Sequence, residues 1–215
     1  MDRSSLTFRT LKNVAYNFLA YAWPFLFSVI ITPIIIAKLG IQQYGIYIFI
    51  NTVSSFISII TSGFSGSSTK YISEYNGRND RASLRKLFNT MNVIFLLIAL
   101  VGTATIMAGL FIGNALSIAS SISFRSLLLF FSLVSASYFI QTSTTLYQAI
   151  PVAMERFDIS SKISIFTGTL GSLGNLALVL MGYGIGALFA WQLFTAVIMV
   201  SISIGISLRL VPESS

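Results

Sequence analysis

The chain contains no cysteine and no histidine among its 215 residues. Without them it has no disulfide, no thiolate chemistry, no imidazole-ligated haem and none of the usual zinc sites. It also lacks the motif of a phosphate-cradling loop, and the glycines of residues 182–186 have no strand before them, as a dinucleotide-binding fold requires. We therefore expect no metal and no cofactor.

Charged residues are scarce as well, at 9% of the chain, whereas 55% of the residues are hydrophobic and the mean hydropathy is +0.85. These values lie outside the range of a soluble domain. At about 1.5 Å per residue, six uncharged runs are each long enough to cross a hydrocarbon core of about 30 Å. The sequence predicts an all-α integral membrane protein, one unit over residues 1–215, with six transmembrane helices at residues 14–37, 44–67, 88–112, 126–150, 163–181 and 185–208.

Two of the predicted connections are short. Residues 38–43 join the first two helices and include Gly40 as a candidate C-cap. A connection of this length makes the two helices antiparallel neighbours. The glycines of residues 182–184 indicate a second tight turn, between the fifth and sixth helices.

The lysines and arginines predict the orientation, because short cytoplasmic loops carry an excess of both. With a cytoplasmic N-terminus, only Lys38 and Arg125 fall on the outer side. Both termini are therefore expected in the cytoplasm. The basic residues that then share the inner side are Arg3, Arg9, Lys12, Lys70, Arg78, Arg81, Arg85, Lys86, Arg156, Lys162 and Arg209.

No charged residue lies inside a predicted span. Pumps driven by protons or sodium commonly keep an ionisable residue at membrane depth, and an enzyme needs an acid, a base or a nucleophile in its site. The spans offer neither, so an enzyme is not indicated. The net charge of +7 comes from residues that flank the spans, so it does not point to nucleic acid either.

Neutral polar side chains recur at helical spacing in several spans, where amides and phenols are costly to expose to lipid. They indicate either a water-accessible cavity or helix packing in which polar groups hydrogen-bond to one another without a substrate. In the fifth span the run TGTLGSLGN favours close packing. The candidate cavity-lining residues of the other spans are Asn17, Tyr21, Asn51, Tyr138, Gln141 and Gln148.

Pro24 lies in the middle of the first span. A proline removes a backbone donor and bends the helix, leaving a carbonyl that neighbours or water must satisfy. Pro24 is therefore either the hinge of a moving helix or the site of a static kink.

The basic segment of residues 70–86 also has two interpretations. Membrane orientation and attraction to anionic headgroups account for it fully. Alternatively, it docks the diphosphate of a lipid-linked substrate at the cytoplasmic face. The donors would be Arg78, Arg81 and Arg85, spaced to share one face of a short helix that begins near Asp80.

Three segments carry a resemblance to a known family: AKLGIQQYGIYIFI after the first span, GSSTKYISEYNGRND after the second and AMERFDISSKI after the fourth. They resemble the N-terminal half of bacterial polysaccharide transporters. These are the oligosaccharide (O-antigen type) flippases of the multidrug/oligosaccharidyl-lipid/polysaccharide exporter superfamily. The similarity spans essentially the whole chain, and LG-x-x-x-YG is its most telling motif.

The resemblance implies a transporter of two six-helix lobes around a central cavity, working by alternating access. It implies movement of an undecaprenyl-diphosphate-linked oligosaccharide across the bacterial inner membrane, as in the synthesis of lipopolysaccharide O-antigen. Besides this substrate and membrane lipids, the expected partners are a second lobe or polysaccharide assembly proteins. The C-terminal lobe is absent from this chain, and it would insert in the same orientation, as a parallel repeat.

Two other functions stay open. An ion-coupled multidrug exporter of the same superfamily would be expected to carry a buried carboxylate, which these spans lack. A non-transporting membrane fragment would pack against a partner without moving anything. Family members that hold the diphosphate with basic residues in the cavity are not matched inside these spans.

Overall fold

The computed structural model of the protein describes the backbone of residues 3–115 and 122–211, and the side chains of Phe18, residues 22–113 and residues 122–211. All the regular secondary structure in this part of the chain is helical. The helices are α1 (Arg3–Leu39), α2 (Ile41–Gly77), α3 (Arg81–Ala115), α4 (Phe124–Ser143), α5 (Thr145–Ala153), α6 (Phe157–Leu180) and α7 (Ile185–Leu210). All of these except α5 are long and apolar enough to cross a membrane, which agrees in number with the six predicted spans and indicates a multi-pass membrane protein.

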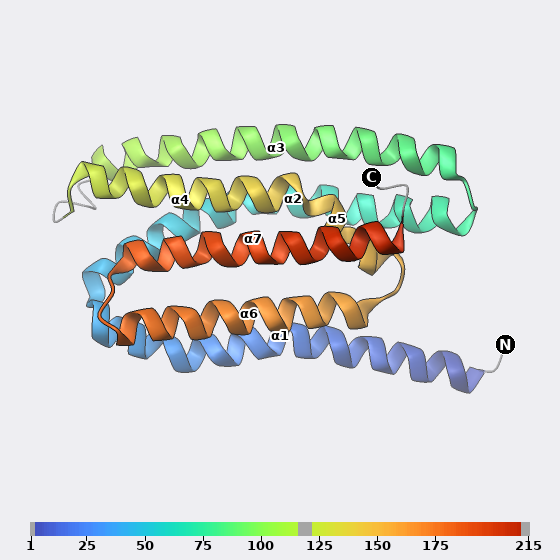
Figure 1. Ribbon diagram of the computed structural model, residues 1–215, viewed down its shortest axis with the longest axis horizontal. Coiled ribbons are helices and arrows are strands. Elements are labelled where there is room, and N and C mark those ends of the chain that lie inside the picture. Colours follow the sequence, from blue (N-terminus) through green and yellow to red (C-terminus); the bar gives the residue numbers. More distant parts are fainter. Residues whose placement is uncertain (1–2, 116–121, 212–215) are drawn as a thin grey trace.

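The helices lie side by side, and successive membrane-length helices run in opposite directions (Figure 1). α1 packs along α6, and α2 to α5 form a second group, with α7 between the two. α1 begins and α7 ends at the same end of the bundle, where the α2–α3 and α5–α6 connections also lie. This agrees with termini on one side of the membrane. Which side that is stays a prediction.

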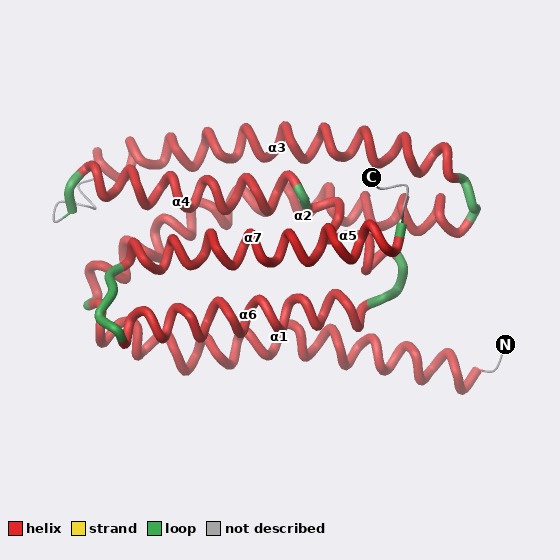
Figure 2. The backbone as a smooth tube through the Cα atoms, in the orientation of Figure 1, coloured by secondary structure: helices red, strands yellow, loops and turns green. Residues whose placement is uncertain are grey.

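The two predicted glycine turns are confirmed, and both appear as short loops at the opposite end (Figure 2). Gly40 has φ +82° and its N–H donates to the carbonyl of Ile36 at 2.9 Å. Gly182 has φ +84°. Both positions are in the left-handed region that favours glycine, which ends one helix and lets the next begin at once.

The prediction that the first two helices are neighbours holds only near their turn. Away from Gly40, α1 packs along α6, whereas α2 packs against α3 and α5 (Figure 1). The turn determines that the helices are antiparallel, but it does not determine what covers their faces. Because α1 does not cover this face of α2, Ser55, Ser58 and Ser62 are exposed on the surface of the bundle.

The segment of residues 68–87 is not the polar connection that hydropathy alone suggests. α2 continues to Gly77 and α3 begins at Arg81, so only residues 78–80 are outside helices. Helices of about 55 Å extend well beyond a core of about 30 Å. Polar residues at the membrane surface can remain helical, because a helix satisfies its own backbone groups in water and in lipid alike.

The fourth predicted span, residues 126–150, is wrong as one continuous helix. α4 ends at Ser143 and α5 begins at Thr145, with Thr144 between them at φ −109° and ψ 11°. The Thr144 hydroxyl donates to the carbonyl of Ile140 at 2.7 Å. Such hydroxyls compete with backbone N–H groups for helix carbonyls. The helix can therefore be interrupted here while the carbonyls keep a hydrogen-bond donor.

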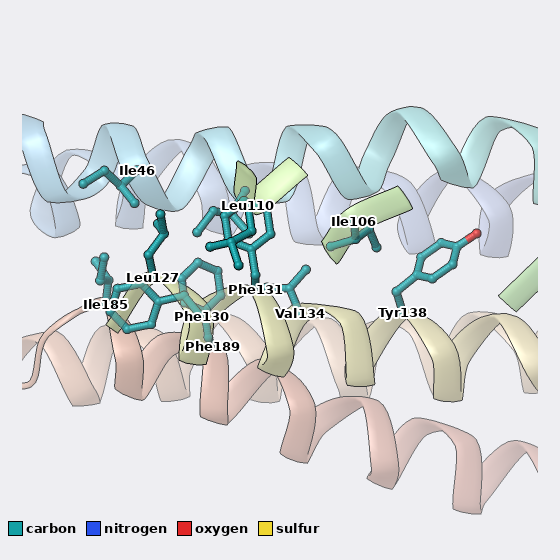
Figure 3. Packing of buried hydrophobic residues seen from close by; sticks show 11 residues of the cluster. Ile46, Ile106, Leu110, Leu127, Phe130, Phe131, Val134, Tyr138, Ile185 and Phe189 are labelled. Carbon is teal, nitrogen blue, oxygen red and sulfur yellow. The ribbon is translucent and has the colours of Figure 1, made fainter. Parts of the chain in front are cut away.

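The central hydrophobic core fills the space between α2, α3, α4 and α7, in the half of the bundle that contains the two glycine turns. Figure 3 shows Phe130 and Phe131 of α4 beside Phe189 of α7, with Ile46 of α2 and Leu110 of α3 close by. Burial of each large side chain stabilises the packing by about 1.5–3 kcal/mol in water, and by less between lipid-embedded helices. This core holds α2, α4 and α7 together on one side of the polar cavity described next.

Candidate functional site

A polar cavity of about 210 Å³ lies between α2, α4 and α7. It opens on the surface of the bundle beside Ser55 and Ser58, which are exposed. α2 supplies one wall because its polar residues recur every third or fourth position and so share one face. The lining residues are Asn51, Ser54, Ser55, Ser58, Val134, Tyr138, Gln141, Thr142 and Gln192.

The structure brings three of the sequence-predicted residues, Asn51, Tyr138 and Gln141, to this one cavity. They come from two spans that are far apart in the sequence. Asn51 Nδ2 donates to its own helix, at the carbonyl of Tyr47, at 2.9 Å. Gln141 Nε2 likewise donates to the carbonyl of Ser137 at 3.3 Å.

Gln192 of α7 completes the cavity, although it is not among the residues predicted from the sequence. Its Nε2 donates to Oδ1 of Asn51 at 3.2 Å, which ties α7 to α2 at this depth. Its Oε1 is buried and has no hydrogen-bond partner among the described residues. The sequence does contain a signal for this residue: Gln192 is the only carboxamide in the apolar run of residues 185–208, and a polar group at membrane depth indicates a functional site.

Tyr138 lines the cavity and also contacts α2 and α3. The hydroxyl lies 3.4 Å from Oγ1 of Thr61 on α2, and the ring lies against Gly102 of α3, where there is no Cβ to block it. Figure 3 shows Tyr138 at the end of the hydrophobic cluster with its oxygen pointing away from Phe130 and Phe131. The tyrosine is thus a wall of the cavity that also joins three helices.

Gln148 lies in a different cavity, about 320 Å³ in volume, nearer the end that holds the termini. The interruption at Thr144 separates it from Gln141, although its Nε2 still donates to the carbonyl of Gln141 at 3.4 Å. The second cavity is also lined mainly by neutral polar and apolar residues: Ser65, Gln148, Pro151, Ser160, Ile163, Ser164, Met199 and Ser203. Sequence spacing alone had placed Gln141 and Gln148 on one continuous face.

Asn17 and Tyr21 belong to α1, and their side chains lie outside the described residues. Pro24 lies inside the same helix. Its Cγ is 3.2 Å from where a Cβ on Gly168 of α6 would lie. Next to it, Trp23 Nε1 donates to Oγ1 of Thr169 at 2.8 Å. α1 and α6 are thus closely packed around Pro24.

Two glycines of the fifth span, which is α6, lie at close contacts between helices, as the sequence predicts. Gly168 accommodates Pro24, and Gly174 lies directly against the indole ring of Trp191 in α7. Trp191 Nε1 in turn donates to the carbonyl of Leu170 at 3.1 Å. Small residues allow this close approach of α1, α6 and α7.

The three candidate diphosphate donors do not share one helix face, which corrects that expectation. Arg78 follows the end of α2 and pairs with Glu74 at 2.9 Å, whereas Arg81 and Arg85 are exposed one turn apart on α3. α3 begins after Asp80 because its Oδ1 accepts a 3.0 Å bond from the N–H of Ser83, an N-cap. Arg78 therefore precedes the helix, and α3 is long, not short.

The electrostatic character of both cavities is neutral. None of the residues that line them is ionisable near pH 7, and the basic side chains lie toward the helix ends. Among the described residues the polar lining consists of carboxamides, hydroxyls and a phenol ring. Such a lining can hydrogen-bond a neutral polar solute, but it offers no acid, base or metal ligand set for catalysis.

We compared the chain with known proteins in three ways, and no family model, no curated sequence and no solved structure matches it.

Proposed function

We propose that this chain is one lobe of a flippase that moves an undecaprenyl-diphosphate-linked oligosaccharide from the cytoplasmic to the outer leaflet of a bacterial inner membrane. The observation that carries the proposal is the neutral cavity of Asn51, Gln141 and Gln192 within a bundle of membrane-spanning helices. Polar groups at that depth are costly to expose to lipid, so they indicate a path for a polar solute.

The surroundings of the cavity suit a substrate with a polar head and an apolar tail. Ser55 and Ser58 form its edge, and on the same helix Phe56, Ile59 and Ile60 are 69%, 65% and 59% exposed. A sugar can occupy the cavity while its polyprenyl chain lies along this apolar surface in the lipid. A fully water-soluble substrate has no use for such an edge.

The end of the bundle that holds the termini offers a first contact for the diphosphate. Arg81 and Arg85 are exposed at the start of α3, with Lys86 next to them. Arginine donates in a planar fork that matches phosphate oxygens, and each contact is charge-assisted. These residues would capture the substrate from the cytoplasmic leaflet before its sugar enters the bundle.

Alternating access needs a second lobe to close the cavity. The exposed serines of α2 mark the surface that this lobe would cover, because a polar face is better paired with protein than with lipid. Pro24 is the hinge candidate of α1, and its packing on Gly168 means that bending there requires α6 to move or to separate.

The test is made in the organism that produces the protein, so that any partner lobe is present. Asn51→Leu and Gln192→Leu are introduced separately, with Gln42→Leu as the control because Gln42 is exposed at the far end of α2. We expect about a tenfold loss of surface polysaccharide in the two cavity variants, with lipid-linked oligosaccharide accumulating inside.

Any of the following three outcomes would reject the proposal. Unchanged surface polysaccharide in both cavity variants would show that the cavity has no part in this transport. Efflux of a cationic dye that depends on Asn51 and Gln192 would indicate the multidrug exporter. Normal polysaccharide after deletion of the whole coding region would indicate a fragment that transports nothing.

A further inference from the structure

The serines that line the cavity between α2, α4 and α7 present hydrogen-bond acceptors to it. The hydroxyls of Ser54, Ser55 and Ser58 each donate to a carbonyl of their own helix, at 3.3, 2.9 and 3.0 Å. Each hydroxyl has then used its one hydrogen but keeps lone pairs that can accept. These three serines can therefore receive a hydrogen bond from a ligand and cannot give one.

The carboxamides contribute both kinds of group. The nitrogens of Asn51, Gln141 and Gln192 each donate one bond to a protein acceptor and keep a second hydrogen. In contrast, Oε1 of Gln192 is buried and accepts no bond from the described residues. A buried acceptor without a donor is unfavourable, so a ligand hydroxyl or N–H that reaches this oxygen would be favoured.

A carboxylate is the wrong partner for this lining. It only accepts hydrogen bonds, and it brings a full negative charge. No lysine or arginine lines the cavity to balance that charge. A charge at membrane depth without a counter-charge is strongly disfavoured.

We infer that the Asn51–Gln192 pair makes this cavity selective for uncharged sugar residues, which offer hydroxyl or acetamido N–H donors, and against sugars that carry a carboxylate. The inference rests on the proposed function, because it names the substrate class of the same site. At about 210 Å³ the cavity suits one sugar ring and not a whole oligosaccharide. Gln192 is the residue that determines specificity, through the free Oε1.

The experiment measures binding directly, so it does not depend on transport. The purified chain in lipid nanodiscs is titrated with two probes, undecaprenyl diphosphate bearing a neutral hexose and the same lipid bearing the corresponding hexuronic acid. Wild type is compared with Gln192→Leu, Gln192→Lys and the control Gln42→Leu. Thermal unfolding of each variant shows that it is folded.

We expect wild type and Gln42→Leu to bind the neutral probe at least about tenfold more tightly than the acidic one. Gln192→Leu should weaken binding of the neutral probe by about tenfold, and Gln192→Lys should reverse the preference by supplying a cation. Equal binding of both probes by wild type would overturn the inference. So would failure to bind either probe, or a neutral-probe affinity that Gln192→Leu leaves unchanged.

The two proposals fail in different ways. Selective binding of the neutral probe with no effect of Asn51 or Gln192 on surface polysaccharide would support the recognition site and reject the flippase. Equal binding of the two probes, together with loss of surface polysaccharide in the cavity variants, would support the flippase function and reject the selectivity for uncharged sugars.

Discussion

The Ser207 hydroxyl of α7 donates a 2.5 Å hydrogen bond to the carbonyl oxygen of Tyr147 in α5. Pro151 explains why that carbonyl is available. A proline has no N–H, so it cannot make the helical hydrogen bond to the carbonyl four residues before it. Ser207 is fully buried and donates to that carbonyl from another helix, which fastens the short helix α5 to α7.

Ser207→Ala should reduce the free energy of unfolding by about 1 kcal/mol, because it removes a buried hydrogen bond that joins α5 to α7. Ser201→Ala is the matched control, since Ser201 is exposed on the same helix and bonds only to Val197 of its own helix. Thermal unfolding in detergent measures both. In a Pro151→Ala background the effect of Ser207→Ala should shrink, because residue 151 then has its own N–H. Equal effects in both backgrounds would contradict this account.

Gly174→Ala should destabilise the protein by about 1–3 kcal/mol, because a Cβ there would overlap the indole ring of Trp191. Gly171→Ala, one turn earlier on α6, is the control, because nothing lies within 4 Å of the new Cβ. The melting temperature and the tryptophan fluorescence of the two variants provide the comparison. If Gly171→Ala were as damaging as Gly174→Ala, the contact with Trp191 would not be the cause.

Asp80 should make the start of α3 sensitive to acid. Hydrogen bonds from the side chain and the backbone of Ser83 lower the pKa of its carboxyl below the ordinary 3.8. A lowered pKa in the folded state means that the charged cap stabilises the protein above pH 3.8 and that this contribution is lost as the pH falls through the lower, folded value. The melting temperature of wild type should exceed that of Asp80→Asn near pH 6, and the gap should close as the pH falls below 3.8. A gap that is constant with pH would show that the charge does not matter.

The orientation can be read by labelling, because a chain without cysteine gives no background. Ile41, between α1 and α2, is 82% exposed, and Arg85 is exposed at the opposite end of the bundle. A membrane-impermeant maleimide should label Ile41→Cys in intact cells and Arg85→Cys only after the cells are opened. The reverse pattern would place the termini outside and remove the proposed capture of substrate by Arg81 and Arg85 from the cytoplasm.

The helix content and the number of spans could be predicted from the sequence, because long uncharged runs have few alternatives in a membrane. The glycine turns at Gly40 and Gly182 were also predictable, since few other residues adopt their backbone angles. The interruption at Thr144 was not, because Ser143, Thr144 and Thr145 are compatible with a continuous helix. The competition between their hydroxyls and backbone N–H groups is resolved only in the packed structure.

The sequence by itself determined that this is an all-helical, multi-pass membrane protein with its charges at the helix ends, because composition and run length decide what lipid can accept. Only the tertiary structure decided which polar residues meet. It placed Gln192 of α7 against Asn51 of α2 and separated Gln148 from Gln141. The physical reason is that spacing along one helix defines a face, whereas a cavity is defined by how faces from different helices are turned toward one another, and that depends on the packing of every side chain between them.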